Sequence, residues 1–179
     1  MPLSICLFCA SSDAVDGAFF DEARQLGGLI ARGGHTLVYG GGCIGLMGAV
    51  ALAVHEQGGR VVGVIPQSME GKPYVYRDAD ELIVTKDLRQ RKQVMDDRAD
   101  AFVALPGGFG TLDEIAEVVA HRQLRAHEKP VVIVNCRGFY GPLLALFDHL
   151  IETRFAKPHH RLSFDVVADA AGALALLEK

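Results

Sequence analysis

The segment AFVALPGGFGTLDE, residues 101–114, decides the fold, because a short apolar run passes through a glycine-rich turn into a helical pattern. Residues 101–105 are continuously apolar, as expected of a strand that is buried on both faces of a sheet. Pro106 fixes the direction of the chain as it leaves this strand, and residues 111–124 have helical periodicity. A strand followed by a tight turn and a helix is one half of a βαβ unit.

The same order of elements recurs along the rest of the chain. Apolar runs predict strands at residues 3–9, 36–39, 61–65, 82–84, 101–105, 131–134 and 166–167. Helical patterns occupy residues 16–32, 46–57, 88–98, 111–124 and 139–153, and a last helix begins at about residue 169. Residues 67–80 are polar and rich in turn formers, which indicates a surface loop. We therefore predict a doubly wound, Rossmann-like α/β fold, in which helices flank a parallel sheet, with residues 1–179 as a single domain.

Composition narrows the functional classes. The chain has 179 residues, of which 50% are hydrophobic and 22% are charged, and this balance excludes a disordered or fibrous protein. The net charge of −4 argues against binding to nucleic acid through backbone phosphates. No apolar run is long enough to span a membrane, and residues 1–12 do not resemble a signal peptide. We expect a cytoplasmic protein with no nucleic-acid or membrane partner.

Cys6 and Cys9 form a C-x-x-C pair, which in other settings indicates redox chemistry. A reactive pair normally lies at a helix N-terminus, whereas Cys6 lies inside an apolar run. Residues three apart on a strand point to opposite faces of the sheet. Core packing in a reduced compartment is the better interpretation, and the scattered histidines offer no matched metal ligands.

A first glycine-rich turn, YGGGCIGLMG, occupies residues 39–48 and contains a literal G-x-G-x-x-G between a predicted strand and a predicted helix. A dinucleotide site also needs an acidic residue after the next strand, but that strand is followed by Pro66 and Gln67. Three interpretations remain open: a dinucleotide site, a structural turn, or a loop that lines a smaller nucleotide or sugar-phosphate pocket. The missing acid favours the last of these.

The second glycine-rich turn, residues 106–111, predicts an anion site. Gly107, Gly108 and Gly110 leave their main-chain N–H groups unshielded, and the helix opens at Gly110 or Thr111. Free N–H groups at the positive end of a helix bind anions, and the Thr111 hydroxyl adds a donor. The alternative is a tight turn in which Thr111 caps the helix and Glu114 completes a capping box.

Charged side chains gather on two of the predicted helices. Arg91 and Arg98 are seven residues apart on the basic helix 88–98 and share a face, and Lys92 lies beside Arg91. Glu114 and Glu117 share a face of the helix that follows the second turn. Both sets are also compatible with solvated, helix-stabilising roles. Beside a phosphate site, however, such a carboxylate can bind ribose hydroxyls or a water molecule.

These motifs resemble those of the Lonely Guy (LOG) family, the cytokinin-activating phosphoribohydrolases. The family's P-G-G-x-G-T-x-x-E stands intact at residues 106–114, and its Y-G-G-G-x-x-G-L-M-G at residues 39–48. Its R-K-x-x-M matches Arg91, Lys92 and Met95, and CLFCASS at residues 6–12 is close to its opening C-x-x-x-S-S. The resemblance runs in order from about residue 3 to residue 155.

The resemblance implies an enzyme that hydrolyses the N-glycosidic bond of a nucleoside 5′-monophosphate and works as a homodimer without cofactor or metal. Arg91 and Glu114 match the positions regarded as catalytic in that family. The substrate-binding residues that we expect lie after the first strand, on the two turns and on the two charged helices: Ser12, Gly41, Gly42, Met47, Lys92, Arg98, Gly107, Gly108, Phe109, Gly110, Thr111, Leu112, Asp113 and Glu117. Members have often been labelled lysine decarboxylases, but nothing in this sequence indicates pyridoxal phosphate chemistry.

The chain departs from the family pattern where the base would be recognised. Arg89 and Gln90 replace a frequent His-Glu pair, and His121-Arg122 stands where plant-like members have a different sequence. A ribose-binding glutamate in the loop 67–80 is either Glu70 or absent. We expect a cytokinin riboside 5′-monophosphate, an N6-modified AMP, as substrate. The alternatives are an AMP or purine 5′-monophosphate nucleosidase and a non-catalytic nucleotide-binding module.

Overall fold

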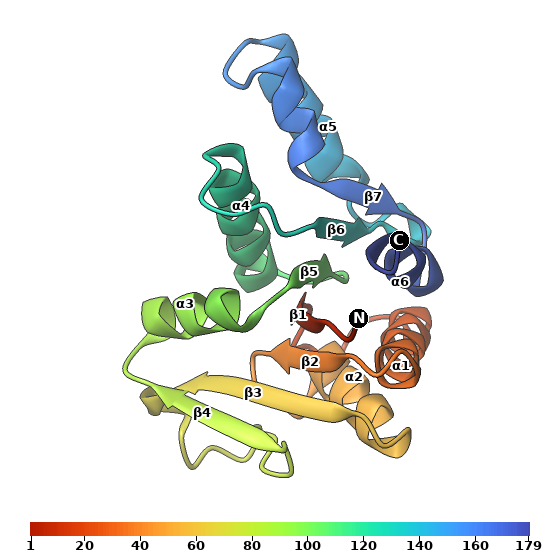
Figure 1. Cartoon of the computed structure of the whole chain (residues 1–179), viewed down its shortest axis with the longest axis vertical. Coiled ribbons are helices and arrows are strands. Elements are labelled where there is room, and N and C mark those ends of the chain that lie inside the picture. The colour runs from red at the N-terminus through yellow and green to blue at the C-terminus, as the bar shows by residue number, and fades with distance from the viewer.

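The computed structural model describes all residues 1–179 and confirms the doubly wound α/β fold (Figure 1). Seven strands form one sheet: β1 (Ser4–Phe8), β2 (Thr36–Tyr39), β3 (Arg60–Pro66), β4 (Glu81–Thr85), β5 (Ala101–Ala104), β6 (Val131–Val134) and β7 (Asp165–Val167). Six α-helices connect or follow them: α1 (Gly17–Arg32), α2 (Gly45–Glu56), α3 (Leu88–Arg98), α4 (Phe109–Gln123), α5 (Gly141–Glu152) and α6 (Ala170–Leu177). None of these helices is long and apolar enough to cross a bilayer.

The strands run in the order β4-β3-β2-β1-β5-β6-β7, and every neighbouring pair is parallel. Ile5 of β1, for example, pairs with Leu37 of β2 on one side and Ala101 of β5 on the other. The strand order therefore reverses between β1 and β5. At such a switch point the loops that leave the two strands diverge, and a crevice opens beyond their carboxyl ends.

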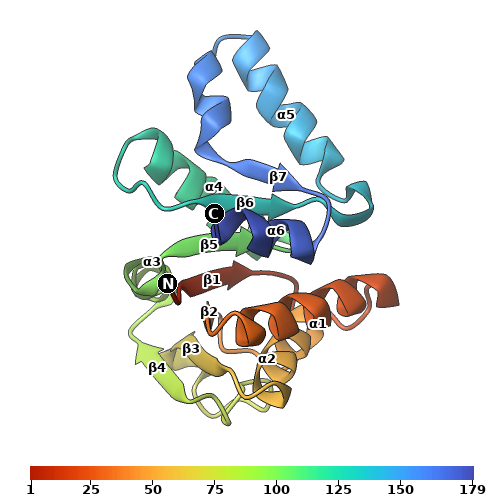
Figure 2. The same ribbon diagram turned by 45° about the vertical axis from the view of Figure 1, so that its right-hand side comes forward.

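The two faces of the sheet carry separate cores, because successive side chains of a strand alternate between faces. Ile5 and Leu7 pack with α1, α2 and α6, and Figure 2 shows these three helices together on one side of the sheet. Cys6 and Phe8 pack with residues of α3 and α4 on the other side. Cys6 and Cys9 are both buried and free, and burial raises the pKa of each thiol. Core packing, not redox chemistry, explains this C-x-x-C.

Two helices begin elsewhere than the sequence predicts. α4 starts at Phe109, two residues before Thr111, and Gly108 is its N-cap. Gly110 therefore lies within the first turn of the helix. α5 starts at Gly141 rather than residue 139, because Tyr140 is buried and Pro142 follows at the start of the helix. The bounds of β2, α3 and β6 are those that the sequence predicts. The other boundaries agree with the prediction to within one residue.

The surface-loop prediction for residues 67–80 is wrong in part, because Val75 and Tyr76 are 5% and 7% exposed. We call residues 72–76 the strap. Its Tyr74 carbonyl accepts a hydrogen bond from the Cys43 N–H at 2.8 Å, and its Tyr76 N–H donates to the Gly41 carbonyl at 2.8 Å. The strap thus pairs antiparallel with the first glycine-rich turn, with Val75 opposite Gly42.

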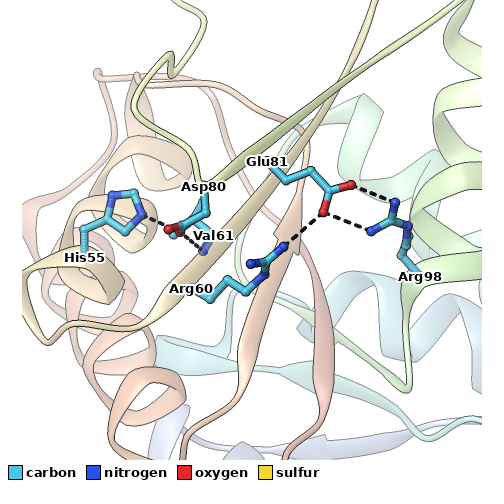
Figure 3. Close-up of polar contacts among 6 residues, drawn as sticks. All are labelled: His55, Arg60, Val61, Asp80, Glu81 and Arg98. Atoms are coloured by element: carbon cyan, nitrogen blue, oxygen red, sulfur yellow. Dashed lines mark hydrogen bonds and ion pairs between the residues drawn. The ribbon is translucent and has the colours of Figure 1, made fainter.

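Polar contacts fix the chain just after the strap (Figure 3). Asp80 accepts hydrogen bonds from the Val61 N–H at 2.8 Å and from His55 Nε2 at 3.0 Å. These two contacts, the main-chain bond first, lower the pKa of Asp80. Glu81 lies between two arginines, Arg60 and Arg98. The end of this segment is therefore tied to α2, β3 and α3.

Candidate active site

A cavity of about 280 Å³ lies at the switch point of the sheet. Helices α2, α3 and α4 supply six of its eleven lining residues, the loops after β1, β2 and β5 supply four, and β1 itself supplies one. Its lining residues are Leu7, Cys9, Ser11, Gly40, Met47, Arg91, Gly108, Phe109, Gly110, Thr111 and Glu114. We call it the switch-point cavity.

Five free main-chain donors lie at the start of α4, and four of the residues that carry them, 108–111, line this cavity. None of the N–H groups of residues 107–111 donates a hydrogen bond to another group of the chain, and Gly108 provides no side-chain cap. The next N–H along the chain, that of Leu112, bonds to the Gly108 carbonyl at 3.0 Å. Free N–H groups at a helix N-terminus carry the positive end of the helix dipole, so this turn is suited to bind a phosphate.

The glycines of this turn have two different reasons for being glycine. A Cβ at Gly107 would overlap the side chain of Thr111, so packing excludes a larger residue there. A Cβ at Gly108 or Gly110 would meet no atom within 4 Å. Packing therefore does not require glycine at these two positions, although both line the switch-point cavity. The absence of side chains there leaves the main chain of both residues exposed on the cavity wall.

The capping-box alternative for Thr111 and Glu114 is wrong. Thr111 lies inside the first turn of α4, is 4% exposed, and faces the cavity instead of capping the helix. Glu114 is paired with a different group. Its Oε1 accepts a hydrogen bond from Arg91 Nη1 at 3.2 Å, across the space between α3 and α4.

Arg91 and Glu114 form a mostly buried ion pair on the wall of the cavity, with side-chain exposures of 14% and 12%. Arg91 Nε also donates to the Val64 carbonyl at 3.0 Å, which fixes the plane of the guanidinium. A Cβ at Gly40 would overlap Arg91 Nη2, so the first glycine of residues 40–42 makes room for this side chain. The pair is thereby positioned by the Val64 carbonyl of β3 and by the space that Gly40 leaves in the first glycine-rich turn.

The electrostatics of Glu114 suit a base. Burial raises its pKa, and the Arg91 charge opposes that rise without abolishing it. A carboxylate that is kept ionised by an arginine but is partly withdrawn from water is a stronger proton acceptor than a solvated one.

Lys92, Asp113 and Glu117 are brought together, but not in the switch-point cavity. Lys92 Nζ lies 3.0 Å from Asp113 Oδ2 and 2.6 Å from Glu117 Oε2. The hydrogen bond to Glu117 is the main cause of the raised Lys92 pKa. Lys92 and Glu117 line a separate, smaller cavity between α3 and α4 that also contains Glu114. Glu114 is thus the residue that connects the charged cluster with the switch-point cavity.

Among the other residues expected to bind substrate, three make contacts elsewhere in the fold. Arg98 pairs with Glu81 at 2.7 Å, and Leu112 packs in the apolar core beneath α4. Ser12 is exposed, and its hydroxyl accepts a hydrogen bond from the Ala14 N–H. Its neighbour Ser11 lines the cavity instead. We therefore leave Arg98, Leu112 and Ser12 out of the proposed site.

The first glycine-rich turn lines two adjoining spaces, and Ile44 is among the residues that it contributes. Gly40 and Met47 line the switch-point cavity, and Gly42 lines an adjoining compartment. Gly41 has φ +71° and packs against Ile65, so its role is structural. The turn therefore lines a pocket, as the third sequence interpretation predicts. Sequence reasoning missed Gly40, although it lies within the motif, and Leu7 and Cys9, whose signal is the end of a strand at the switch point.

The chain matches one protein family model and is similar to several characterised and probable enzymes of plants. The family model described as "Possible lysine decarboxylase" matches residues 47–177. A probable cytokinin riboside 5′-monophosphate phosphoribohydrolase of Oryza sativa subsp. japonica is 43% identical over 175 residues, covering 98% of this chain and 77% of the relative. A cytokinin riboside 5′-monophosphate phosphoribohydrolase of Arabidopsis thaliana is 41% identical, covering 98% of this chain and 75% of the relative.

Solved structures agree on the fold. The molybdenum cofactor carrier protein from Chlamydomonas reinhardtii is 26% identical with a TM-score of 0.75, covering 99% of this chain and 97% of that chain. The molybdenum cofactor binding protein from Rippkaea orientalis has a TM-score of 0.73 over 99% of this chain and 97% of its own, at 22% identity. The likeness to the second protein concerns the fold alone.

Proposed function

Because the chain belongs to the LOG family of cytokinin riboside 5′-monophosphate phosphoribohydrolases, we propose that it hydrolyses the N-glycosidic bond of an N6-modified AMP. The products are the free base and ribose 5-phosphate. The observation that carries the proposal is the buried Arg91–Glu114 pair on the wall of a cavity that residues 108–111, with their free main-chain N–H groups, also line.

The N–H groups of residues 107–111 bind the 5′-phosphate in this proposal. A phosphate held at the start of α4 places the ribose over the first turn of that helix, where Glu114 lies one turn further on. Fixing the sugar beside its catalytic groups lowers the entropic part of the barrier. The same N–H groups cannot hold an unphosphorylated nucleoside, so the proposal includes selectivity for monophosphates.

Glu114 acts on the sugar. Cleavage of an N-glycosidic bond builds positive charge on the ribose ring, as in other glycoside cleavages. An ionised Glu114 stabilises this charge or accepts a proton from the attacking water. The water adds its oxygen to the sugar carbon and gives up a proton as the bond to the base breaks. The electron pair of that bond leaves with the base, which takes up a proton from solvent water.

Arg91 orients Glu114 and polarises the departing base. Its two hydrogen bonds, to Glu114 and to the Val64 carbonyl, leave part of the guanidinium facing the cavity. A guanidinium does not give up a proton under physiological conditions, so Arg91 is not the acid that protonates the base. Its contribution is electrostatic, and Arg91→Ala is expected to slow release of the base from a monophosphate.

We further propose that residues 1–179 form a single nucleotide-monophosphate-binding domain that works as a cytoplasmic homodimer. Four free cysteines support a reducing compartment. Strongly exposed apolar side chains support a second copy as partner, among them Phe109 at 92% and Leu124 at 73% on or next to α4.

Base release from three compounds tests the proposed function. The purified protein is incubated with AMP, with N6-isopentenyl-AMP and with adenosine, and free base is measured by chromatography. We expect the protein to release free base from the two monophosphates. In a Glu114→Gln variant we expect this release to be about 10²–10⁴-fold slower, with an unchanged circular dichroism spectrum. Release of base from adenosine in preference to the monophosphates would contradict the phosphate site.

A protein that binds monophosphates without cleaving them would be a nucleotide-binding module. That alternative has one specific observation in its favour, the shared fold of a protein described as a molybdenum cofactor carrier. Equal turnover of AMP and N6-isopentenyl-AMP would instead indicate a general purine monophosphate nucleosidase.

A further inference from the structure

Two tyrosines are the largest fully buried side chains of the protein, and each of them holds a carbonyl at a glycine-rich turn. Tyr39 is 0% exposed, and its hydroxyl donates to the Gly42 carbonyl of the first turn at 3.0 Å. Tyr140 is 1% exposed, and its hydroxyl donates to the Leu105 carbonyl, immediately before the second turn, at 2.7 Å. Neither tyrosine lines the switch-point cavity, so any effect on a ligand there passes through the main chain of the turns.

Tyr140 is itself held firmly just before α5. Its N–H donates to Asn135 Oδ1 at 2.7 Å, across a tight turn in which Arg137 and Gly138 have positive φ. Its ring packs in the core that β1, β5 and α4 share, and lies edge-on against Phe139 with ring centroids 4.9 Å apart. Burial is the main cause of the raised pKa of Tyr140, so the hydroxyl keeps its proton and acts as a donor.

The Leu105 carbonyl needs this donor. Leu105 is fully buried and lies one residue beyond Ala104, the last residue of β5 that pairs with β6. A buried carbonyl without a partner costs free energy. On the other side, the Leu105 N–H donates to the Phe8 carbonyl of β1 at 3.0 Å. Both polar groups of the residue before Pro106 are therefore fixed, the N–H by β1 and the carbonyl by Tyr140.

The second glycine-rich turn takes its direction from this point. The Pro106 carbonyl accepts a hydrogen bond from the Ala10 N–H at 3.1 Å. Because a peptide unit is planar and trans, fixing the Pro106 carbonyl directs the Gly107 N–H to the opposite side. The N–H groups of residues 107–111 have no partner within the chain. The carbonyls of Leu105 and Pro106 are thus the fixed points from which the five free donors are presented.

We propose that Tyr140 is a positioning residue for the substrate phosphate: through the Leu105 carbonyl, its hydroxyl holds the second glycine-rich turn in the shape in which the N–H groups of residues 107–111 bind the anion. This inference rests on the proposed function. Donors that are held in place before the ligand arrives need no ordering on binding. Without the hydroxyl, the Leu105 carbonyl is left without its partner, and the turn relaxes toward water or another donor.

Tyr140→Phe removes the hydroxyl and keeps the ring. Ribose 5-phosphate is not cleaved, so calorimetric titration well below the Tm measures its affinity directly. We expect a loss of about 10-fold, the size expected when one hydrogen bond to a charged group is weakened. In ¹H–¹⁵N spectra without ligand, the amides of residues 107–111 should shift. Asn135→Ala is a second variant, which keeps the hydroxyl but frees the Tyr140 main chain, and it should also weaken binding.

Tyr39→Phe is the matched control, because it removes an equally buried hydroxyl from a carbonyl outside the switch-point cavity. It should lower the Tm by a similar amount and leave the affinity for ribose 5-phosphate unchanged. Unchanged affinity in Tyr140→Phe or in Asn135→Ala would overturn the positioning role, as would an equal loss of affinity in Tyr39→Phe. If the wild-type protein does not bind ribose 5-phosphate, the phosphate site itself fails, which is a different outcome from a lost effect of Tyr140.

Discussion

Replacing Gly110 by alanine should make the protein more stable and its phosphate site weaker. Gly110 is the second residue of α4 and lines the switch-point cavity. A Cβ at this position would meet no atom within 4 Å, so the folded chain accepts a methyl group without rearrangement. In the complex, the same methyl group occupies space that the phosphate needs to reach the N–H groups.

The two effects have opposite signs and separate origins. A glycine-to-alanine change at a compatible position stabilises a protein by about 0.4–1 kcal/mol, chiefly by restricting the unfolded chain. For a chain of this length that corresponds to a rise in Tm of roughly 1–4 °C. A hydrogen bond to a charged group contributes about 1.5–3 kcal/mol. Loss of one such bond weakens binding roughly 10- to 100-fold.

Thermal unfolding measures the gain in stability of Gly110→Ala, and calorimetric titration with ribose 5-phosphate measures its loss of affinity. Gly141→Ala is the matched control, because Gly141 is the first residue of α5 and a Cβ there also meets nothing within 4 Å. It should raise Tm by a similar amount without changing the affinity for ribose 5-phosphate. An unchanged affinity in Gly110→Ala would refute the assignment of the phosphate to this turn.

Three further predictions follow from contacts around the site. Gly40→Ala displaces the Arg91 guanidinium without unfolding the protein, so steady-state kinetics should show a loss of kcat of the same order as in Arg91→Ala. The pKa of Glu114, followed by ¹³C-carboxyl NMR, should lie above the usual value and should rise further in Arg91→Leu, because Arg91 lowers it; a fall would contradict the pairing. Tyr140→Phe removes the buried hydrogen bond to the Leu105 carbonyl at 2.7 Å and should cost about 1–3 kcal/mol in urea unfolding.

The fold could be predicted from sequence because most of its strands are continuous apolar runs and because Gly33 and Gly58 mark the ends of α1 and α2. β2, α3 and β6 lie where the pattern places them. The strap could not be predicted from sequence. Polar residues lie next to Val75 and Tyr76 in the chain, and the burial of these two side chains depends on pairing with a turn some 30 residues earlier.

The part of the candidate site that could be predicted from sequence consists of residues that are close together in the chain. Glu114 and the glycines around it follow one another in the chain, so the turn itself specifies their arrangement. Arg98 shares a helical face with Arg91 but lies roughly 10 Å further along the axis, at a rise of about 1.5 Å per residue. Its partner Glu81 comes from β4, and only the order of the strands brings the two together.

Amide chemical shifts test the central claim most directly, because the claim concerns the N–H groups of residues 107–111. Uniformly ¹⁵N-labelled protein is titrated with ribose 5-phosphate, and the shift of each assigned amide is followed. The largest saturable changes should fall on residues 107–111, with smaller ones at Glu114 and Gly40. Saturable binding that leaves those five amides unmoved, or no binding at all, would contradict the account.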